Sequence, residues 1–100
     1  MINREQARQL FVSQVCNRPD WLPPEDELIV VDEATFEKSW GWVFFYTSKK
    51  WLETRSVKYA LAGNSPWIVE RESGKLICTG TSMSIEHYIA NYERCGNPHG

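Results

Sequence analysis

Two segments of the chain carry hydrophobic residues at helical spacing, one near each end. The first runs from Arg4 to Cys16, and its apolar positions are Ala7, Leu10, Phe11 and Val15. The second runs from Ser84 to Arg94, and its apolar positions are Ile85, Tyr88, Ile89 and Tyr92. Asn3 and Gln6 can cap the start of the first segment, and Ser82 or Ser84 can cap the second. The pattern predicts a helix near each end of the chain.

Between these helices the pattern favours four β-strands, at residues 28–36, 40–47, 67–72 and 75–79. The second strand would place Trp40, Trp42, Phe44 and Tyr46 on one face and Gly41, Val43, Phe45 and Thr47 on the other. Both faces are largely apolar, so we expect this strand to be central in the sheet. Ser73-Gly74 predicts a hairpin between the last two strands. Residues 48–62 have only a weak period, and a short helix or an ordered excursion would fit them equally well.

This order of elements predicts an α+β fold with an antiparallel sheet. We expect a single domain with about four strands and with an N-terminal and a C-terminal helix, in the order α-β-β-β-β-α. A short helix between strands 2 and 3 is possible in this scheme. The 100 residues of the chain suit one domain. Gly96 and Pro98 stop the last helix, so the domain should span 1–95 and leave 96–100 as a loose tail.

Composition places the chain among ordinary globular proteins, with 42% hydrophobic and 24% charged residues. No run of residues approaches the length of a membrane span, and Met1 to Gln9 lacks the apolar core of a signal peptide. The three cysteines are widely spaced, which favours reduced thiols over a disulfide framework. We therefore expect a cytoplasmic protein that does not bind membranes.

The formal net charge of −2 hides an uneven distribution along the chain. The segment from Asp20 to Glu37 holds seven acidic residues and no lysine or arginine, whereas Lys38 to Lys58 holds five basic residues against Glu53 alone. An acidic surface would repel nucleic-acid phosphates and would suit a basic protein partner. The alternative interpretation is a solvated loop and strand edge.

Few residues argue for catalysis. Cys78 and His87 could form a nucleophile and its base, but Cys78 lies within an apolar strand pattern, where a thiol usually behaves as a small buried hydrophobe. Glu70 and Glu72 share one face of a strand, a position that is more often a solvated surface than an acid–base pair. With only two histidines and wide cysteine spacing, no zinc pattern is present. We expect no catalytic, cofactor-binding or metal-binding residues.

Five tryptophans are many for this length, and exposed tryptophans often anchor protein interfaces. Trp42 and Trp67 fit a core, whereas Trp21 and Trp51 lie in irregular segments beside charged residues. We combine Trp21 and Trp51 with acidic residues of the chain as a hypothesis for a partner-binding surface. Its members are Trp21, Glu25, Asp26, Glu27, Asp32, Glu33, Trp51, Glu53, Glu70 and Glu72.

Several blocks of the chain together resemble a known family. They are Gly41-Trp42-Val43-Phe44, Trp51-Leu52-Glu53-Thr54, Leu61-Ala62-Gly63-Asn64-Ser65-Pro66, Ile68-Val69-Glu70-Arg71, Ser73-Gly74, Gly80-Thr81, Ile85-Glu86-His87-Tyr88-Ile89 and Tyr92-Glu93. In this order they resemble the immunity protein 35 (YrhB-like) family of bacterial polymorphic toxin systems. The motif residues themselves fit turns and core, so we do not assign them as contacts to a partner.

The resemblance implies a small cytoplasmic protein of bacterial competition, whose partner is a cognate toxin domain. It implies neutralisation by direct stoichiometric binding that blocks the toxin's active site or substrate groove, with no enzymatic activity, no cofactor and no nucleic acid. We expect a monomer or a small homo-oligomer. The alternatives are a chaperone-like or housekeeping binding protein of the same fold and, third, a small enzyme.

Overall fold

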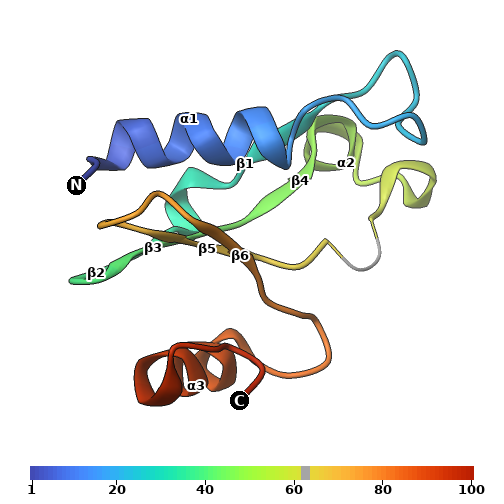
Figure 1. Cartoon of the computed structure of the whole chain (residues 1–100). Helices are drawn as coiled ribbons and strands as arrows, with labels where there is room; N and C mark the ends of the chain where they lie inside the picture. The colour runs from blue at the N-terminus through green and yellow to red at the C-terminus, as the bar shows by residue number, and fades with distance from the viewer. Residues whose placement is uncertain (62–63) are drawn as a thin grey trace.

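The fold is a sheet with one helix on each face, as seen in a computed structural model that describes residues 1–61 and 64–100 (Figure 1). Helix α1 (Arg4–Gln14) crosses one face of the sheet, and α3 (Ile85–Cys95) lies on the opposite side. The predicted α+β class with a helix near each end is confirmed. Ala62 and Gly63, which the sequence assigned to the excursion and to the following turn, lie outside the described residues.

All strand pairs described are antiparallel. The main sheet has the order β2 (Phe36–Lys38), β3 (Gly41–Phe44), β5 (Trp67–Glu70) and β6 (Leu76–Cys78). A second, two-stranded sheet pairs β1 (Leu28–Val30) with β4 (Tyr46–Ser48). Strand β3 lies between β2 and β5, so the predicted central position of its residues is confirmed.

Two predicted strands are each divided in the structure. The predicted strand 28–36 is broken by a 3₁₀ turn, η1 (Asp32–Ala34), and the predicted strand 40–47 is broken at Phe45. The two breaks face each other, because Val31 N–H donates to Phe45 O at 2.8 Å. The result is one long hairpin with a bend in its middle, which separates the two-stranded sheet from the main sheet.

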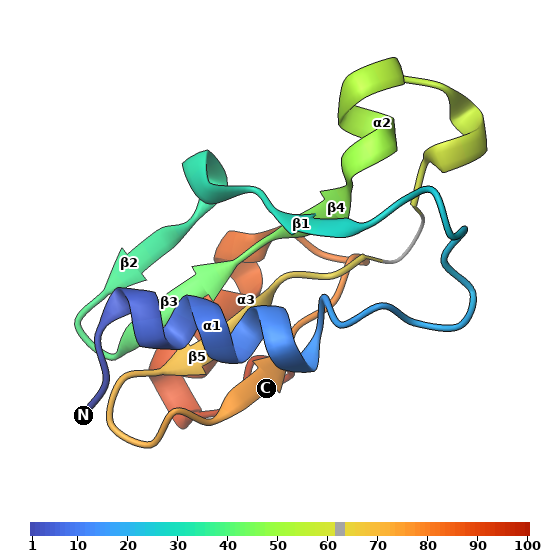
Figure 2. The ribbon, with the colours of Figure 1, turned by 90° about the horizontal axis from the view of Figure 1, so that it is seen from above.

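The region after β4 contains a short helix, which is one of the two alternatives that the sequence left open. Helix α2 (Lys49–Thr54) is followed by a 3₁₀ turn, η2 (Val57–Tyr59). Ser48 caps α2 by accepting from Trp51 N–H at 3.1 Å, and Arg55 ends it in the left-handed conformation with φ of 55°. Both α2 and η2 project beyond the main sheet (Figure 2).

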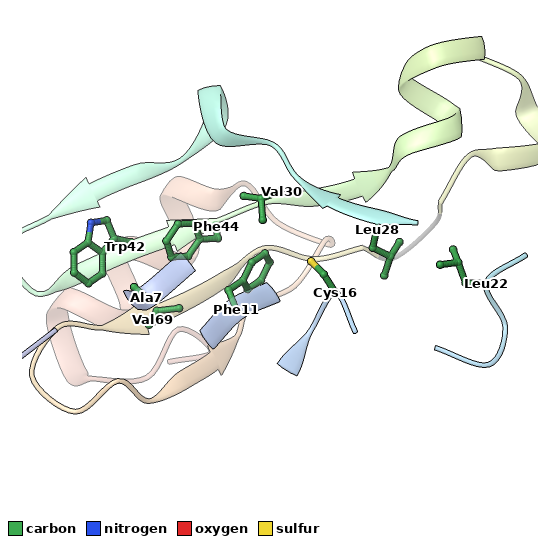
Figure 3. Packing of buried hydrophobic residues seen from close by; sticks show 9 residues of the cluster. All are labelled: Ala7, Phe11, Cys16, Leu22, Leu28, Val30, Trp42, Phe44 and Val69. Atoms are coloured by element: carbon green, nitrogen blue, oxygen red, sulfur yellow. The ribbon is translucent and has the colours of Figure 1, made fainter. Parts of the chain in front are cut away.

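The larger core lies between α1 and the sheet. It forms a strip of buried side chains, and Figure 3 labels its members as Ala7, Phe11, Cys16, Leu22, Leu28, Val30, Trp42, Phe44 and Val69. Phe11 stacks on Phe44 with 5.4 Å between ring centroids. Trp67 packs against this core, so the core assignments of Trp42 and Trp67 are confirmed. Burial of such large apolar surfaces supplies most of the stabilisation of a small domain.

The smaller core lies between the sheet and α3, and it contains Val43, Ile68 and Ile89. Trp40 belongs to this side, so its predicted place beside Trp42 is wrong. Trp40 stands in the turn before β3, where the strict alternation of a strand does not yet apply. Its ring contacts Tyr92 at 4.6 Å between centroids, and its Nε1–H donates to Glu93 at 2.9 Å.

The predicted helix caps are confirmed. Asn3 and Gln6 form a reciprocal capping box at α1, and Ser84 caps α3. The tail assignment for 96–100 stays a prediction. In the structure Pro98 is buried and its carbonyl accepts from Asn91 Nδ2 at 3.1 Å.

Gly41 generates a test of the sheet. An added Cβ at this position would lie 2.1 Å from Val69 O, and the residue has a φ of +153°. Because the obstacle is backbone of the paired strand, Gly41→Ala should cost more than about 4 kcal/mol of unfolding free energy. Gly96→Ala is the matched control, since no atom lies within 4 Å of its added Cβ and only the φ of +77° is strained. The control should lose about 1 kcal/mol in urea unfolding.

Similar losses in the two variants would contradict this account, because an added Cβ meets the neighbouring strand at Gly41 and meets no atom within 4 Å at Gly96.

Candidate functional site

One end of the molecule is built from two segments that are far apart in the sequence. The loop 17–27 and the segment 49–59, which contains α2 and η2, lie together there, and we call this the loop–α2 end (Figures 1 and 2). Glu25 connects them, because it accepts from Tyr59 Oη at 3.2 Å and lies 3.9 Å from Lys58 Nζ.

Asp26 is buried at this end and connects the loop to α2. Its side chain is only 3% exposed, and its carboxylate accepts from Ser48 Oγ, from Glu27 N–H at 2.7 Å and from Lys50 N–H at 3.0 Å. Burial by itself raises the pKa of Asp26, but these hydrogen bonds outweigh it and leave the pKa below its ordinary value. The carboxylate therefore stays ionised and joins the loop to the start of α2.

Arg18 braces the same loop from the other side. Its guanidinium donates to Asp26 O at 2.6 Å and to Pro23 O at 3.2 Å. Sequence reasoning missed Arg18, because it stands just before the acidic block and looks like an ordinary helix-terminal residue. A charged guanidinium that bonds two carbonyls of a proline-containing loop reduces the conformations open to that loop. The loop is thus held by both a buried anion and a cation.

The acidic and basic blocks of the sequence meet in space. Glu27 pairs with Lys49 at 3.2 Å, and Glu25 pairs with Lys58. Asp32 binds Arg8 through two hydrogen bonds at 2.8 and 3.1 Å, which hold the pKa of Asp32 below its usual range. The acidic block therefore does not form a purely anionic face. Its charges are largely compensated by neighbouring cations.

The proposed contact residues divide into separate places. Trp21, Glu25, Glu27, Trp51 and Glu53 gather at the loop–α2 end, and Asp26 lies beneath them. Asp32 and Glu33 lie on η1. Glu70 and Glu72 lie at the β5–β6 turn, toward the other end of the molecule (Figure 1).

Glu70 is already engaged within the fold. Its carboxylate accepts from Tyr92 Oη at 2.6 Å and from Ser73 Oγ at 2.7 Å. The hydrogen bond from Tyr92, followed by that from Ser73, lowers the pKa of Glu70, while burial and then this same bond raise the pKa of Tyr92. Glu70 thus connects β5 to α3, which is a structural role.

The two candidate anchors differ in exposure. The Trp21 side chain is 62% exposed, and the Val57 side chain on η2 is 87% exposed at the same end. Trp51 is half-buried, and the guanidinium of Arg55 lies 5.4 Å from the centre of its ring. Val57 carried no sequence signal, because an isolated valine in an irregular segment is equally common in cores. Trp21 is therefore the more exposed of the two tryptophans.

A shallow pocket of about 240 Å³ opens between the loop and the start of α2 at this end. Its lining is charged and consists of Arg18, Glu25, Asp26, Glu27, Lys49, Lys50 and Glu53. Both signs of charge are present, and within this lining Glu27 pairs with Lys49 and Glu53 with Lys50.

The thiol and imidazole groups do not form a catalytic arrangement among the described residues. Cys78 is exposed, so its predicted burial is wrong; it lies on β6, an outer strand of the main sheet. Its Sγ lies 3.3 Å from Ser65 Oγ, whereas His87 Nε2 lies 3.2 Å from Asn91 Nδ2. Cys16 is the buried cysteine, and burial raises the pKa of its thiol to about 11.

Residues 1–61 and 64–100 hold no cluster of three or more histidine, cysteine, aspartate or glutamate side chains suited to a metal ion. Within the same residues, no helix combines the length and the apolar character needed to cross a bilayer.

The sequence model of the immunity protein 35 family matches residues 14–91. This match covers most of the chain, which therefore belongs to that family, and the resemblance noted from the sequence is confirmed. The chain is also similar to the uncharacterized protein YrhB of Escherichia coli (strain K12), with 38% identity over 55 residues. That stretch is 55% of this chain and 58% of the length of YrhB. No solved structure matches the chain.

The role of Asp26 is testable by Asp26→Ala. The change leaves two backbone N–H groups and the Ser48 hydroxyl without their acceptor, so we expect a loss of about 2–4 kcal/mol in urea unfolding at pH 7. Asp20→Ala removes an exposed carboxylate from the same loop and should change stability by less than about 0.5 kcal/mol.

The pH dependence follows from the lowered pKa. A carboxylate whose folded pKa lies below its unfolded value stabilises the fold at neutral pH, and this contribution is lost as the pH falls below about 4. The wild-type protein should therefore lose more stability than Asp26→Ala between about pH 5 and pH 2. If the unfolding free energies of the wild type and of Asp26→Ala changed equally with pH, Asp26 would not be a buried, ionised carboxylate that connects the loop to α2.

Proposed function

We propose that this protein neutralises a bacterial toxin domain by direct stoichiometric binding in the cytoplasm. Membership of the immunity protein 35 family supports a toxin-neutralising role. Protection would come from occupying the toxin's active site or substrate groove, without turnover. A single copy of the chain would suffice, and neither nucleic acid nor a membrane would take part.

We place the contact at the loop–α2 end. The observation that carries this choice is the exposed indole of Trp21 on a loop braced by Asp26 and Arg18. Leaving a large aromatic side chain in water forgoes its burial energy, so such a residue on a rigid loop is typical of a binding anchor. Val57 and Leu52 on the segment 49–59 are also exposed apolar residues at this end.

The rigidity of the loop strengthens the proposal. Association costs conformational entropy whenever a loop must be ordered on binding. Here the hydrogen bonds of Asp26 and Arg18 order the loop before any partner arrives. The indole is therefore presented in a defined place, and more of its burial energy remains available for affinity.

The charges of the loop–α2 end would serve specificity. Glu25 and Glu27 are each paired with a lysine within the protein, so the surface has little net field to attract a partner over a distance. A partner with a matching arrangement of charges can exchange these pairs at contact, whereas a mismatched partner leaves charges unpaired. We expect binding to be only weakly dependent on salt.

The test is Trp21→Ala, and its readout is the affinity for a toxin domain that the wild-type protein binds and neutralises. If the indole is the anchor, affinity should fall about 30-fold, by ~2 kcal/mol, while the melting temperature stays nearly constant. Met83→Ala is the control, because Met83 is also an exposed apolar residue but lies outside the loop–α2 end. It should leave both affinity and melting temperature unchanged.

Unchanged affinity of Trp21→Ala would remove the loop–α2 end as the contact surface. Failure of the wild-type protein to bind any toxin domain, or catalytic turnover of a substrate by the purified protein, would overturn the proposed function itself.

A further inference from the structure

Strand β6 forms one outer edge of the main sheet. The backbone bonds that flank its pairing with β5 run from Glu70 N–H to Lys75 O at 2.9 Å and from Thr79 N–H to Pro66 O at 3.1 Å. Hydrogen-bonded positions alternate along an antiparallel ladder, so Ile77 faces β5. The N–H and C=O groups of Leu76 and Cys78 consequently point outward, away from β5. We call these four groups the β6 edge.

The opposite edge of the sheet is protected. Strand β2 is as short as β6, but it is preceded by the 3₁₀ turn η1 and carries Glu37 and Lys38. Glu37 lies 3.5 Å from Arg4 and 3.6 Å from Arg71, so charged side chains cover this side. Short strands, interruptions and charges are the usual means by which proteins prevent pairing at an edge.

The β6 edge has none of the charges that protect β2. The strand consists of Leu76, Ile77 and Cys78, which are all uncharged and at least partly exposed. The flank of α1 beside it forms an open groove of about 450 Å³, lined by Ile2, Gln6, Gln9, Leu10 and Ser13. Gly74 in the β5–β6 turn lies next to Leu10 and Ile2, which places this flank on the β6 side of the helix (Figure 2).

One group of the β6 edge is already used by the end of the chain. His99 Nε2 lies 3.1 Å from Cys78 O, and its ring contacts Tyr88 at 5.8 Å between centroids. The imidazole thus occupies the position that the N–H of an added strand would take. The remaining outward groups are the N–H and C=O of Leu76 and the N–H of Cys78.

We propose that the β6 edge binds an extended, uncharged, apolar segment of a partner protein as an additional antiparallel or parallel strand, with the His99 imidazole displaced. The alternating outward donors and acceptors of the edge specify a main chain as occupant. The groove beside α1 then receives apolar side chains from one face of that segment. This site lies apart from Trp21, and the proposal does not depend on the neutralisation of a toxin.

A second copy of this chain fits the edge less well. Three residues of strand span only about 10 Å. A symmetric contact centred on such a short edge would fall below the roughly 1,200–2,000 Å² that stable interfaces bury. An extended segment needs only the edge groups and the adjacent groove.

The experiment uses the full chain and a synthetic probe. The probe is an acetylated, amidated hexapeptide of alternating threonine and valine, and the readout is amide hydrogen exchange and NMR shift at each backbone position. We expect saturable binding below roughly 1 mM. Protection should increase at the Leu76 and Cys78 amides, which face outward, and not at the Ile77 amide. The same peptide with every backbone nitrogen methylated keeps its side chains but loses all of its N–H donors, and it should not bind.

Two variants sharpen the test. His99→Ala removes the competing donor and should tighten peptide binding about fivefold, the usual worth of one hydrogen bond. Cys78→Pro removes only an outward N–H, so it should fold and bind the peptide at least tenfold more weakly than Cys78→Ser. Ile77→Pro, which removes a bond to β5, should instead destabilise the fold.

Absence of binding at about 1 mM peptide, or equal binding of the N-methylated peptide, would overturn the proposal. Unchanged affinity in His99→Ala would overturn the displacement of the imidazole. Exchange protection at Leu76 and Cys78 that increases with protein concentration alone would show that a second copy is the occupant, and would also overturn it. None of these outcomes depends on toxin binding, so they are distinguishable from a failure of the proposed function.

Discussion

The buried carboxylate of Asp26 is the constraint on which the loop–α2 end depends. A charged group with almost no exposure is tolerated only where hydrogen bonds replace its hydration. Ser48 and the N–H groups of Glu27 and Lys50 provide those bonds, and Ser48 also caps α2. A single ionised group thereby positions the loop, the end of β4 and the first turn of α2 relative to each other.

Pairing of opposite charges changes how the protein can recognise a partner. In sequence, the acidic block and the basic block are separate; in space they neutralise one another through contacts such as Glu27 with Lys49. Exposed pairs of this kind contribute little to stability, usually less than about 1 kcal/mol each. Because the charges are paired, they leave little net electrostatic field that could attract a partner over a distance. Recognition at this end would then rest on shape, on the indole and on local charge matching.

The two edges of the main sheet differ in how they are protected from pairing with another strand. Its β2 edge is interrupted and charged, while its β6 edge is uncharged and carries only the imidazole of His99. Leaving one edge open is a hazard for aggregation unless it is covered. The C-terminal residues provide partial cover, since Pro98 is buried and bonded to Asn91. The same residues could control access to the edge.

Much of the fold could be predicted because it depends on short-range patterns. The periodicity of α1 and α3, the capping box of Asn3 with Gln6, and the hairpin at Ser73-Gly74 are determined by neighbouring residues. The interruption at Phe45 could not be predicted, because it lies opposite the turn η1 (Asp32–Ala34), which shifts the pairing register of the hairpin between β1–β4 and β2–β3. Local propensity does not contain such long-range pairing.

The candidate site shows the same division. The sequence by itself determined that Trp21 lies in an irregular, proline-containing loop within a run of acids, and that the chain has the motifs of its family. Only the tertiary structure decided that Asp26 is buried, that Arg18 braces the loop and that Cys78 is exposed. The physical reason is that exposure and charge compensation depend on which distant segments meet. The sequence pattern does not specify these tertiary contacts, since they result from burying the apolar surface of the whole chain at once.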